Sequence, residues 1–250
     1  MQKKEISKLI YFTLGNNVNY LKLANLCISS LYKNGYDGDF LFITNMKNEI
    51  LGEIEFKKEP YFLETDQSDL IHSSSNKLKL YKFKEVSNFD KIIFSDLDII
   101  WTSNPDKIFD LIETYEFYMS NEDALMSDEW WGSQLLFSEE RVIIQQGKIK
   151  GVNAGIFAFS SKMVHHLEKI ENYLKQNIHL INQCLEQPYL NVYLFRNKIY
   201  NTKLTNLVSH SGYHLNNFDG VVLHFAGGPG NFSPKYEKML NFFENNIEKE

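Results

Sequence analysis

The stretch KIIFSDLDII, residues 91–100, decides how this chain folds. Its first five residues predict a buried strand, because β-branched and aromatic side chains dominate them. Asp96 and Asp98 follow at once, and in an extended segment residues i and i+2 point the same way. Two carboxylates at the mouth of a buried strand repel each other and lose hydration unless a cation lies between them. Because Mg²⁺ and Mn²⁺ prefer oxygen ligands, the pattern indicates a divalent metal site at the carboxyl edge of a central strand, where open α/β sheets bind ligands.

Composition limits the classes to which the chain can belong. Its 250 residues suffice for one large domain or two small ones, and 43% of them are hydrophobic and 23% charged, as is usual for globular proteins. A net charge of −6 and a pI near 5.7 argue against a general nucleic-acid binder, which would present a basic face. A nucleotide ligand stays compatible with this charge, because a metal ion can carry the phosphate groups.

Cysteines and apolar runs give expectations about location. Cys27 and Cys184 lie far apart without zinc-site spacing, so we expect buried, reduced thiols, which fit a reducing compartment. No apolar segment follows residues 1–5 as it would in a signal peptide. No apolar run approaches the roughly 20 residues of a transmembrane helix. We therefore expect a cytoplasmic protein without a transmembrane segment, and leave open a peripheral contact with a membrane.

Strands and helices alternate along the first half of the chain. Residues 6–14 predict a buried strand, residues 19–33 a helix with apolar side chains at helical spacing, and residues 39–44 a second strand. A strand–helix–strand unit implies parallel pairing with a right-handed crossover. This order predicts a single α/β domain whose C-terminal half is less regular.

The remaining elements follow from the same patterns. Further strands are predicted at 50–60, 91–95, 116–120, 153–160, 198–201 and 221–225. Helices are predicted at 66–85, 104–113, 162–176, 180–195 (one helix or two, broken near Pro188) and 234–246. Residues 122–131 predict a loop, and residues 134–150 are ambiguous. The lysines at 77, 79, 82 and 84 are expected on a solvated helix face.

Two further motifs have residue types suited to ligand binding. His224 ends the apolar run 221–225 and precedes a Gly-rich loop, residues 227–230. A neutral imidazole is a good ligand for Mn²⁺, and glycines let backbone N–H groups approach phosphate oxygens. Asn153-Ala154-Gly155 precedes another apolar strand, where it is either a turn or a place where an amide and bare backbone approach a polyol.

The order of these motifs resembles glycosyltransferase family 8 and its close relatives. The resemblance rests on Asp96-Leu97-Asp98, Asn153–Phe157, Glu186–Asn191 and His224–Gly227 in that sequence, and it spans most of the chain. Members of this family are metal-dependent, retaining enzymes of the GT-A fold that use nucleotide-sugar donors. The resemblance implies a mixed, mostly parallel sheet flanked by helices in one domain. It also implies a nucleotide-binding half at about 1–105 and a sugar and acceptor half at about 106–250.

The same resemblance implies an activity. The expected reaction moves a hexose from a nucleoside-diphosphate sugar, UDP-linked by expectation, to a hydroxyl of a glycan, a lipid-linked saccharide or a protein, with retention. Mn²⁺ or Mg²⁺ would be the cofactor, and the partners would be the donor and the acceptor, without nucleic acid. Donor sugar, acceptor and linkage stay open, because the sugars differ by one hydroxyl orientation or one substituent.

Individual roles carry over by position. Asp96, Asp98 and His224 would hold the metal, and Asp98 would also contact the ribose. The residues expected around the donor are Tyr11 and Thr13 at the base and ribose, Lys79 on the helix before the Asp96 strand, and Gly227 in the Gly-rich loop. Asn153 and Gly155 would line the sugar or acceptor pocket. Glu186-Gln187 matches the Asp-Gln pair that lies near the sugar in the family, with Glu in place of Asp.

Another position departs from the family pattern. The family commonly has a Lys three residues after the Gly of its His-x-x-Gly motif, where it contacts the diphosphate, but this chain has Gly230. Lys235 is the nearest substitute. Trp130 and Trp131 are either an acceptor-side sugar platform or a hydrophobic plug under a loop.

Two other functions stay open. A haloacid-dehalogenase-type phosphatase also has an Asp-x-Asp after an apolar strand, and Asp96 would be its nucleophile. That motif normally lies near the chain start, whereas several elements precede it here. The other alternative is a non-catalytic protein that binds nucleotide sugars.

Overall fold

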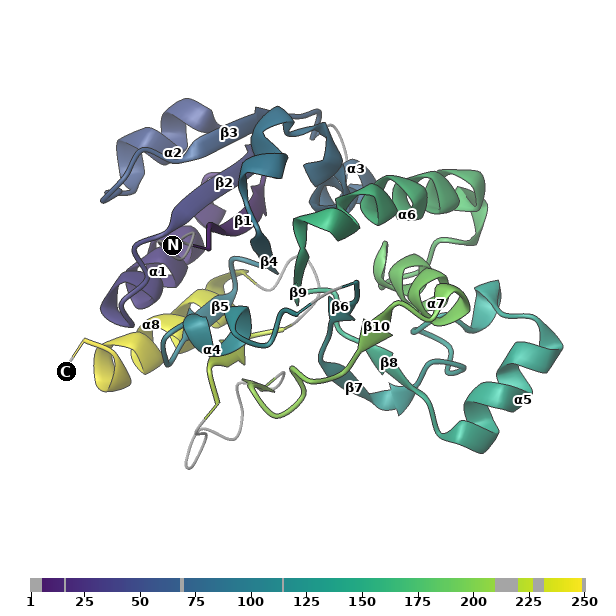
Figure 1. The fold of residues 1–250 in the computed structure, drawn as a ribbon. Helices are drawn as coiled ribbons and strands as arrows, with labels where there is room; N and C mark the ends of the chain where they lie inside the picture. Colours follow the sequence, from purple (N-terminus) through teal and green to yellow (C-terminus); the bar gives the residue numbers. More distant parts are fainter. Residues whose placement is uncertain are drawn as a thin grey trace, which may run out of the picture.

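A seven-stranded sheet forms the centre of the protein (Figure 1). The computed structural model describes residues 6–15, 17–67, 70–113, 115–209, 220–226 and 232–248. In spatial order the strands are β10 (Tyr200–Asn201), β6 (Phe117–Tyr118), β9 (Ile156–Ser160), β4 (Lys91–Ser95), β1 (Lys8–Leu14), β2 (Asp39–Thr44) and β3 (Tyr61–Glu64). Strand β9 is antiparallel to its neighbours β4 and β6, and the other pairs are parallel. The sheet is therefore mixed and mostly parallel, as predicted.

Two smaller sheets adjoin the large one. One contains β11 (Val208–Ser209), β12 (Val222–His224) and β5 (Ile99–Trp101), with β12 antiparallel to β5. The other pairs β7 (Asn121–Leu125) with β8 (Lys150–Val152). Strand β5 begins four residues after β4 ends, so the chain passes from the large sheet into the small one through the Asp96–Asp98 segment.

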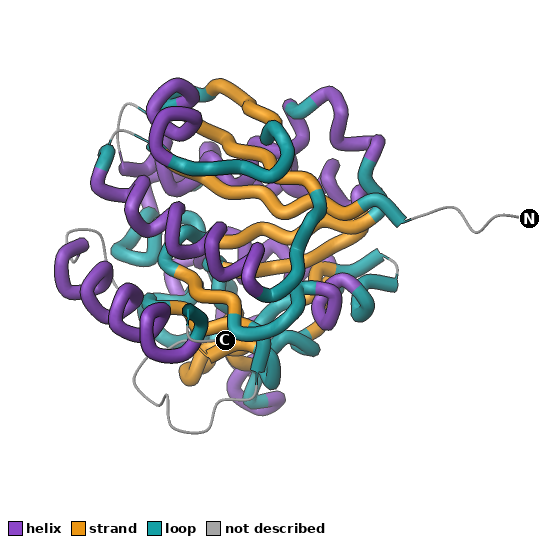
Figure 2. Tube along the Cα trace, turned by 90° about the vertical axis from the view of Figure 1, so that its left-hand side faces the viewer, coloured by secondary structure: helices purple, strands orange, loops and turns teal. Residues whose placement is uncertain are grey.

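Helices cover both faces of the large sheet. Figure 2 shows the strands, in orange, lying between helices, in purple. Helix α1 (Asn19–Lys33) and helix α8 (Phe232–Asn246) share one hydrophobic cluster with Ile10, Phe12 and Ile93. The opposite cluster contains Tyr11 and Phe94, together with residues of the 3₁₀ helix η1 (Asn76–Lys82) and helix α6 (Val164–Gln176). Because neighbouring residues of β1 and β4 face opposite clusters, these strands are apolar throughout, as parallel strands buried on both faces are. Each fully buried side chain of this kind contributes about 1.5–3 kcal/mol.

The other helices are short or peripheral. They are α2 (Lys47–Glu53), α3 (Leu70–Ser75), η2 (Lys84–Asn88), α4 (Asp106–Phe109), η3 (Ser133–Leu135), α5 (Ser138–Gly147), η4 (Ser161–Met163), η5 (Ile178–Leu180) and α7 (Gln187–Asn197). In Figure 1, α1 and α8 lie at the left and α6 at the right, with the end of β4 between them. No helix in the described ranges combines the length and the apolar character needed to cross a bilayer.

The predicted strand–helix–strand start is confirmed. Helix α1 and strand β2 have the predicted bounds, β1 begins two residues later than predicted, and β1 and β2 pair in parallel. Strand β4 also has the predicted bounds. The late strands β10 and β12 and the C-terminal helix lie within two residues or so of the predicted ranges.

Several predicted elements were wrong. Residues 47–53 form helix α2, and the strand begins only at Tyr61, because the apolar alternation at 54 and 56 lies in the connection between them. The predicted loop 122–131 contains most of β7, whose partner β8 lies 25 residues or more along the chain and leaves no local signal. Pro188 does not break a helix. It lies at the first turn of α7, where a missing N–H costs nothing.

The solvated lysine face was also wrong for two of its four members. Residues 76–82 form a 3₁₀ helix packed against the sheet and α6, and both Lys77 and Lys79 are buried in it. Lys82 and Lys84 are exposed as predicted. A 3₁₀ helix turns every three residues, so an argument from α-helical spacing assigns the wrong faces.

Candidate functional site

The two aspartates occupy the connection between the large sheet and the small one. The Asp96 N–H donates to the Gly155 carbonyl at 2.7 Å, and the Asp98 carbonyl accepts from the Phe225 N–H at 2.8 Å. These bonds continue the ladders of β4 with β9 and of β5 with β12. The segment is thereby fixed at both ends by strands from much later in the chain.

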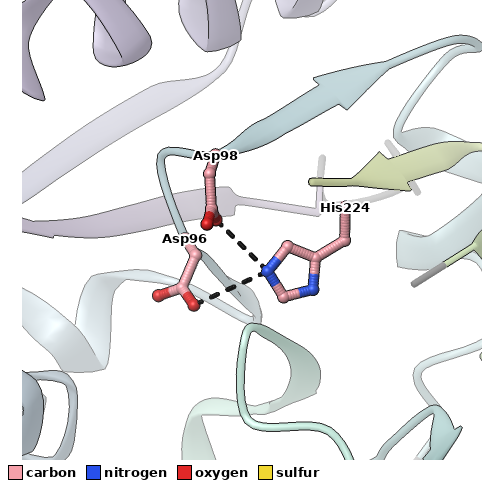
Figure 3. A group of neighbouring side chains, drawn as sticks. All are labelled: Asp96, Asp98 and His224. Carbon is pink, nitrogen blue, oxygen red and sulfur yellow. Dashed lines mark ion pairs between the residues drawn. The ribbon is translucent and has the colours of Figure 1, made fainter. Parts of the chain in front are cut away.

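Strand pairing also brings His224 to the aspartates. In the register of β12 with β5, His224 lies opposite Ile99, the residue after Asp98. His224 Nε2 is 3.2 Å from Asp98 Oδ1 and 4.0 Å from Asp96 Oδ2, and Figure 3 shows the ring edge directed at both carboxylates. One ligand atom from each residue lies within 4.8 Å of the others. The structure thus joins the three residues that the sequence predicts as ligands, although 126 positions separate Asp98 from His224 (224 − 98).

These residues fit a divalent cation. Two carboxylates and one imidazole are the donor types that Mn²⁺ accepts. Gly155 leaves room beside them: a Cβ on this residue would lie 2.2 Å from His224 Cε1 and 2.9 Å from Asp96 Oδ2. A side chain at 155 would displace the ligands, so the glycine keeps the space between them free.

Lys77 reaches the aspartates from η1. Its Nζ donates to the Ala154 carbonyl at 3.0 Å, pairs with Glu186 Oε1 at 2.8 Å and lies 3.5 Å from Asp96 Oδ1. Lys77 and Glu186 side chains are only 7% and 6% exposed. Burial alone would lower the pKa of Lys77, but the carboxylates of Asp96 and Glu186 outweigh it and raise the pKa above its ordinary value. Lys77 is therefore a fixed cation in the wall of the site.

The two aspartates differ in their affinity for protons. Burial raises the pKa of Asp96 to about 6, with Asp98 adding to the shift and Lys77 opposing it. Burial would also raise the pKa of Asp98, but His224 and Lys235 outweigh it, and that pKa is lowered. The same pairing raises the pKa of His224 against the effect of burial.

Glu122 connects the two remaining polar groups of the site. Its Oε1 accepts from Asn153 Nδ2 at 2.8 Å and from Gln187 Nε2 at 3.0 Å, and Gln187 donates as well to the Val152 carbonyl at 3.0 Å. Asn153 Oδ1 in turn accepts from the Gly155 N–H at 2.7 Å. Both amide orientations are thereby fixed. Sequence reasoning missed Glu122, although it follows the strand predicted at 116–120 much as Asp96 follows β4.

Two adjoining cavities open at these residues. One of about 560 Å³ is lined by Thr13, Tyr20, Gln67, Asp98 and Lys235 among others. The second, of about 350 Å³, is lined by Glu122, Trp131, Asn153, Gln187 and His224 among others. Lys77, Asp96, Asp98 and Glu186 line both cavities. The charged residues thus form the boundary between two chambers.

The remaining predicted residues have distinct places. Thr13 lines the larger cavity, and Lys235 lines it too and forms an ion pair with Asp98. Tyr11 is fully buried behind the site, where its hydroxyl donates to the Lys77 carbonyl at 2.9 Å. Gly227 lies outside the described residues. Lys79 is the clear departure. It lines a separate cavity on the far side of η1, and the lysine of η1 that lies beside Asp96 is Lys77.

Solved structures share this architecture. The chain is similar over its whole length to the bifunctional glycosyltransferase WbbM, with 12% identity and a TM-score of 0.61, and it spans about half (52%) of that protein. It is also similar to the galactosyltransferase LgtC, solved in complex with donor and acceptor sugar analogues; the match has 14% identity and a TM-score of 0.62 and covers 93% of this chain and 95% of LgtC. No protein-family model and no curated protein matches the sequence. The fold is therefore the GT-A fold of these glycosyltransferases.

Proposed function

We propose that the protein is a metal-dependent glycosyltransferase that moves a hexose from a UDP-linked sugar to a hydroxyl acceptor. One observation carries the proposal: Asp96, Asp98 and His224 converge at the boundary between two cavities, beside the cations of Lys77 and Lys235. LgtC shares the fold and was solved with donor and acceptor sugar analogues. A donor and an acceptor are accordingly the ligands that we assign to this chain.

The two cavities divide the substrate. The nucleoside would occupy the larger one, where Thr13, Tyr20 and Gln67 offer hydroxyl, ring and amide groups. The hexose and the acceptor would occupy the smaller one, where the amides of Asn153 and Gln187 are already oriented and Trp131 supplies an apolar wall. We propose on this basis a nucleotide-binding half at about 1–105 and a sugar and acceptor half at about 106–250, with residues 183–187 and Lys235 of the second half also lining the larger cavity.

Charge explains why a cation belongs to this reaction. Asp96, Asp98 and Glu186 carry three negative charges against the two positive charges of Lys77 and Lys235, which leaves the boundary negative. A diphosphate would be repelled from it. Mn²⁺ or Mg²⁺ held by Asp96, Asp98 and His224 would neutralise the diphosphate and stabilise it as the leaving group. Lys235 would take the place of the phosphate-binding Lys that position 230 lacks.

The protein's own groups favour front-face transfer with retention. Glu186 is ion-paired with Lys77 and buried, so it is a poor nucleophile and serves to stabilise the positive charge that develops on the sugar. Glu122 holds the Gln187 amide so that its carbonyl oxygen can face the same sugar. The acceptor hydroxyl then attacks the anomeric carbon from the side that the diphosphate leaves, and its proton passes to a departing phosphate oxygen. Water is excluded by the bound substrates.

A donor panel tests the proposal. The purified protein is incubated with Mn²⁺ and a set of UDP- and other nucleotide sugars, and release of nucleoside diphosphate is measured. We expect release from at least one donor, and its loss in Asp98→Asn and His224→Ala. Asp110→Asn is the matched control, because Asp110 is exposed and lies outside both cavities.

Two results would contradict the proposal. If no donor gives release, the protein is not a transferase of this kind, and metal-independent affinity for UDP would favour a binding protein. If a phosphate ester traps an aspartyl-phosphate at Asp96, the haloacid-dehalogenase-type alternative is correct.

A further inference from the structure

A third cavity lies on the other side of η1, away from the aspartates. Its volume is about 520 Å³, and it lies between the α3–η1 segment and α6. Its apolar wall is made of Ile71, Leu174 and Ile178. Three lysines, Lys79, Lys82 and Lys175, line it together with one carboxylate, Glu171. Neither of the cavities at the aspartates includes any of these residues.

Lys79 is the unusual member of this set. The residue is only 8% exposed, and its ammonium forms no hydrogen bond or ion pair with any residue of the described ranges. Burial lowers the pKa of Lys79. The carboxylates of Glu171 and Asp66 oppose this shift, but the neighbouring charges of Lys82 and Lys175 add to it, and the pKa stays below its ordinary value. A buried ammonium without a counter-ion is unfavourable, and an anion in the cavity would remove that cost.

The carboxylate in the wall is already engaged. Glu171 Oε1 pairs with Lys175 Nζ at 2.7 Å, and Glu171 Oε2 accepts from the Tyr81 hydroxyl at 2.6 Å. Its charge therefore offsets one of the three lysines, and the cavity is left with two positive charges. A phosphate monoester carries about −1.5 to −2 at neutral pH, which matches this surplus.

We propose that this cavity is a binding site for a phosphate monoester that carries an apolar group. Lys79, Lys82 and Lys175 bind the phosphate, and the apolar group packs against Ile71, Leu174 and Ile178. The volume is far larger than a phosphate ion alone requires, and Ile71, Leu174 and Ile178 offer apolar contacts to the remainder of the ligand. The site depends on the geometry of η1 and α6 and not on the proposed transferase activity.

Phenyl phosphate is a suitable probe, since it combines the two chemistries in a small molecule. Its binding to the full-length protein is measured by calorimetry, with phenol and inorganic phosphate as the two halves of the probe. Saturating UDP and Mn²⁺ are present so that the cavities at the aspartates are occupied. We expect phenyl phosphate to bind more tightly than either half. Equal affinity for phenol would show that the lysines contribute nothing, and equal affinity for inorganic phosphate would show that the apolar wall contributes nothing; either result overturns the proposal.

Variants assign the binding to this cavity. Lys79→Met should weaken phenyl phosphate binding about tenfold or more, because it removes one charge-assisted contact and keeps the apolar stem. Lys82→Gln should weaken phenyl phosphate binding less than Lys79→Met does. Because Lys82 is exposed, this second variant should fold even if Lys79→Met does not. Lys84→Met is the matched control, since Lys84 is exposed on the next turn and outside the cavity. Unchanged binding in both Lys79→Met and Lys82→Gln would overturn the proposal, whether or not the protein transfers sugars.

A second arm identifies the source of the phosphate. Vesicles of phosphatidylcholine with and without phosphatidic acid are sedimented with the wild type and with Lys79→Met. Lys79-dependent sedimentation with phosphatidic acid would assign the site to a lipid headgroup. Binding of phenyl phosphate without sedimentation would assign it to a soluble phosphate ester.

Discussion

Lys77 and Lys79 are two residues apart on one 3₁₀ helix and are buried in opposite environments. Lys77 faces the aspartates, where the Ala154 carbonyl and two carboxylates surround its ammonium, and its pKa is raised. Lys79 faces a partly apolar cavity, where its ammonium forms no hydrogen bond or ion pair with a described residue, and burial lowers its pKa. The first lysine is stabilised by the protein itself. The second lysine lacks an ion-pair partner among the described residues, and an anionic ligand can supply one.

The buried charges of the two regions differ in whether the protein itself supplies their partners. Charges at the end of β4 are paired with one another and form a rigid wall. Charges beside α6 leave a surplus, so the cavity attracts an anion. Each of the following experiments changes one side of this contrast.

Loss of the cation at the aspartates should have the largest effect. Asp98→Asn removes one ligand charge and also the partner of Lys235 and His224. Turnover should fall about 10²–10³-fold, and chelation of the wild type should abolish it reversibly. Nucleoside diphosphate release measures both. Activity that survives chelation would place the chemistry outside the Asp96, Asp98 and His224 group.

Breaking the ion pair on the balanced side should cost stability. Lys77→Met leaves Glu186 buried without its cation, and the free energy of unfolding should fall by about 3–5 kcal/mol in urea titrations. The double variant Lys77→Met/Glu186→Met should recover most of this loss, because both charges are then absent. Additive losses in the double variant would mean that the pair does not interact.

A methyl group beside the ligands should have an intermediate effect. Gly155→Ala would place its Cβ against His224 and Asp96, so that the ligands must move. We expect a loss of about 1–3 kcal/mol in unfolding free energy and at least about tenfold weaker Mn²⁺ binding by calorimetry. Gly52→Ala is the matched control: nothing lies within 4 Å of its Cβ, and alanine favours helix α2. If the two variants bound Mn²⁺ alike, the space at Gly155 would be irrelevant to the metal.

The smallest effect should come from Lys79, and its sign should be opposite. Lys79→Met removes an ammonium that folding buries without a partner, so the variant should be slightly more stable than the wild type at neutral pH. Folding lowers the pKa of Lys79. Burying the charged ammonium therefore costs folding stability at a pH below this lowered pKa, and the cost disappears as the pH rises towards the ordinary pKa of a lysine. The stability gap should therefore close at alkaline pH. Urea midpoints at several pH values measure it, with Lys84→Met as the reference; a destabilised Lys79→Met would mean that the ammonium has a favourable partner.

Much of the site follows from residue order alone. Asp96, Asp98 and His224 each end an apolar run, and strand ends at one edge of an α/β sheet meet. The bounds of α1, β2 and β4 follow equally well, because their apolar spacing matches their own geometry. These features are local, or they depend on a sheet edge that the strand order already implies.

Tertiary structure alone decided which lysine faces the aspartates, that Glu122 holds Asn153 and Gln187, and that a third cavity exists beside α6. The spacing of apolar residues indicates which residues of an α-helix share a face. Residues 76–82, however, form the 3₁₀ helix η1, packed between the sheet and α6, and this packing determines the direction of each side chain. Contacts such as Glu122 with Gln187 join residues 65 positions apart through a short, irregular strand pair. The sequence determined the strands and the ligands at their ends, because hydrophobic periodicity is a local property; the partners of each buried charge were decided by packing, because burial and ion pairing depend on every element that closes around them.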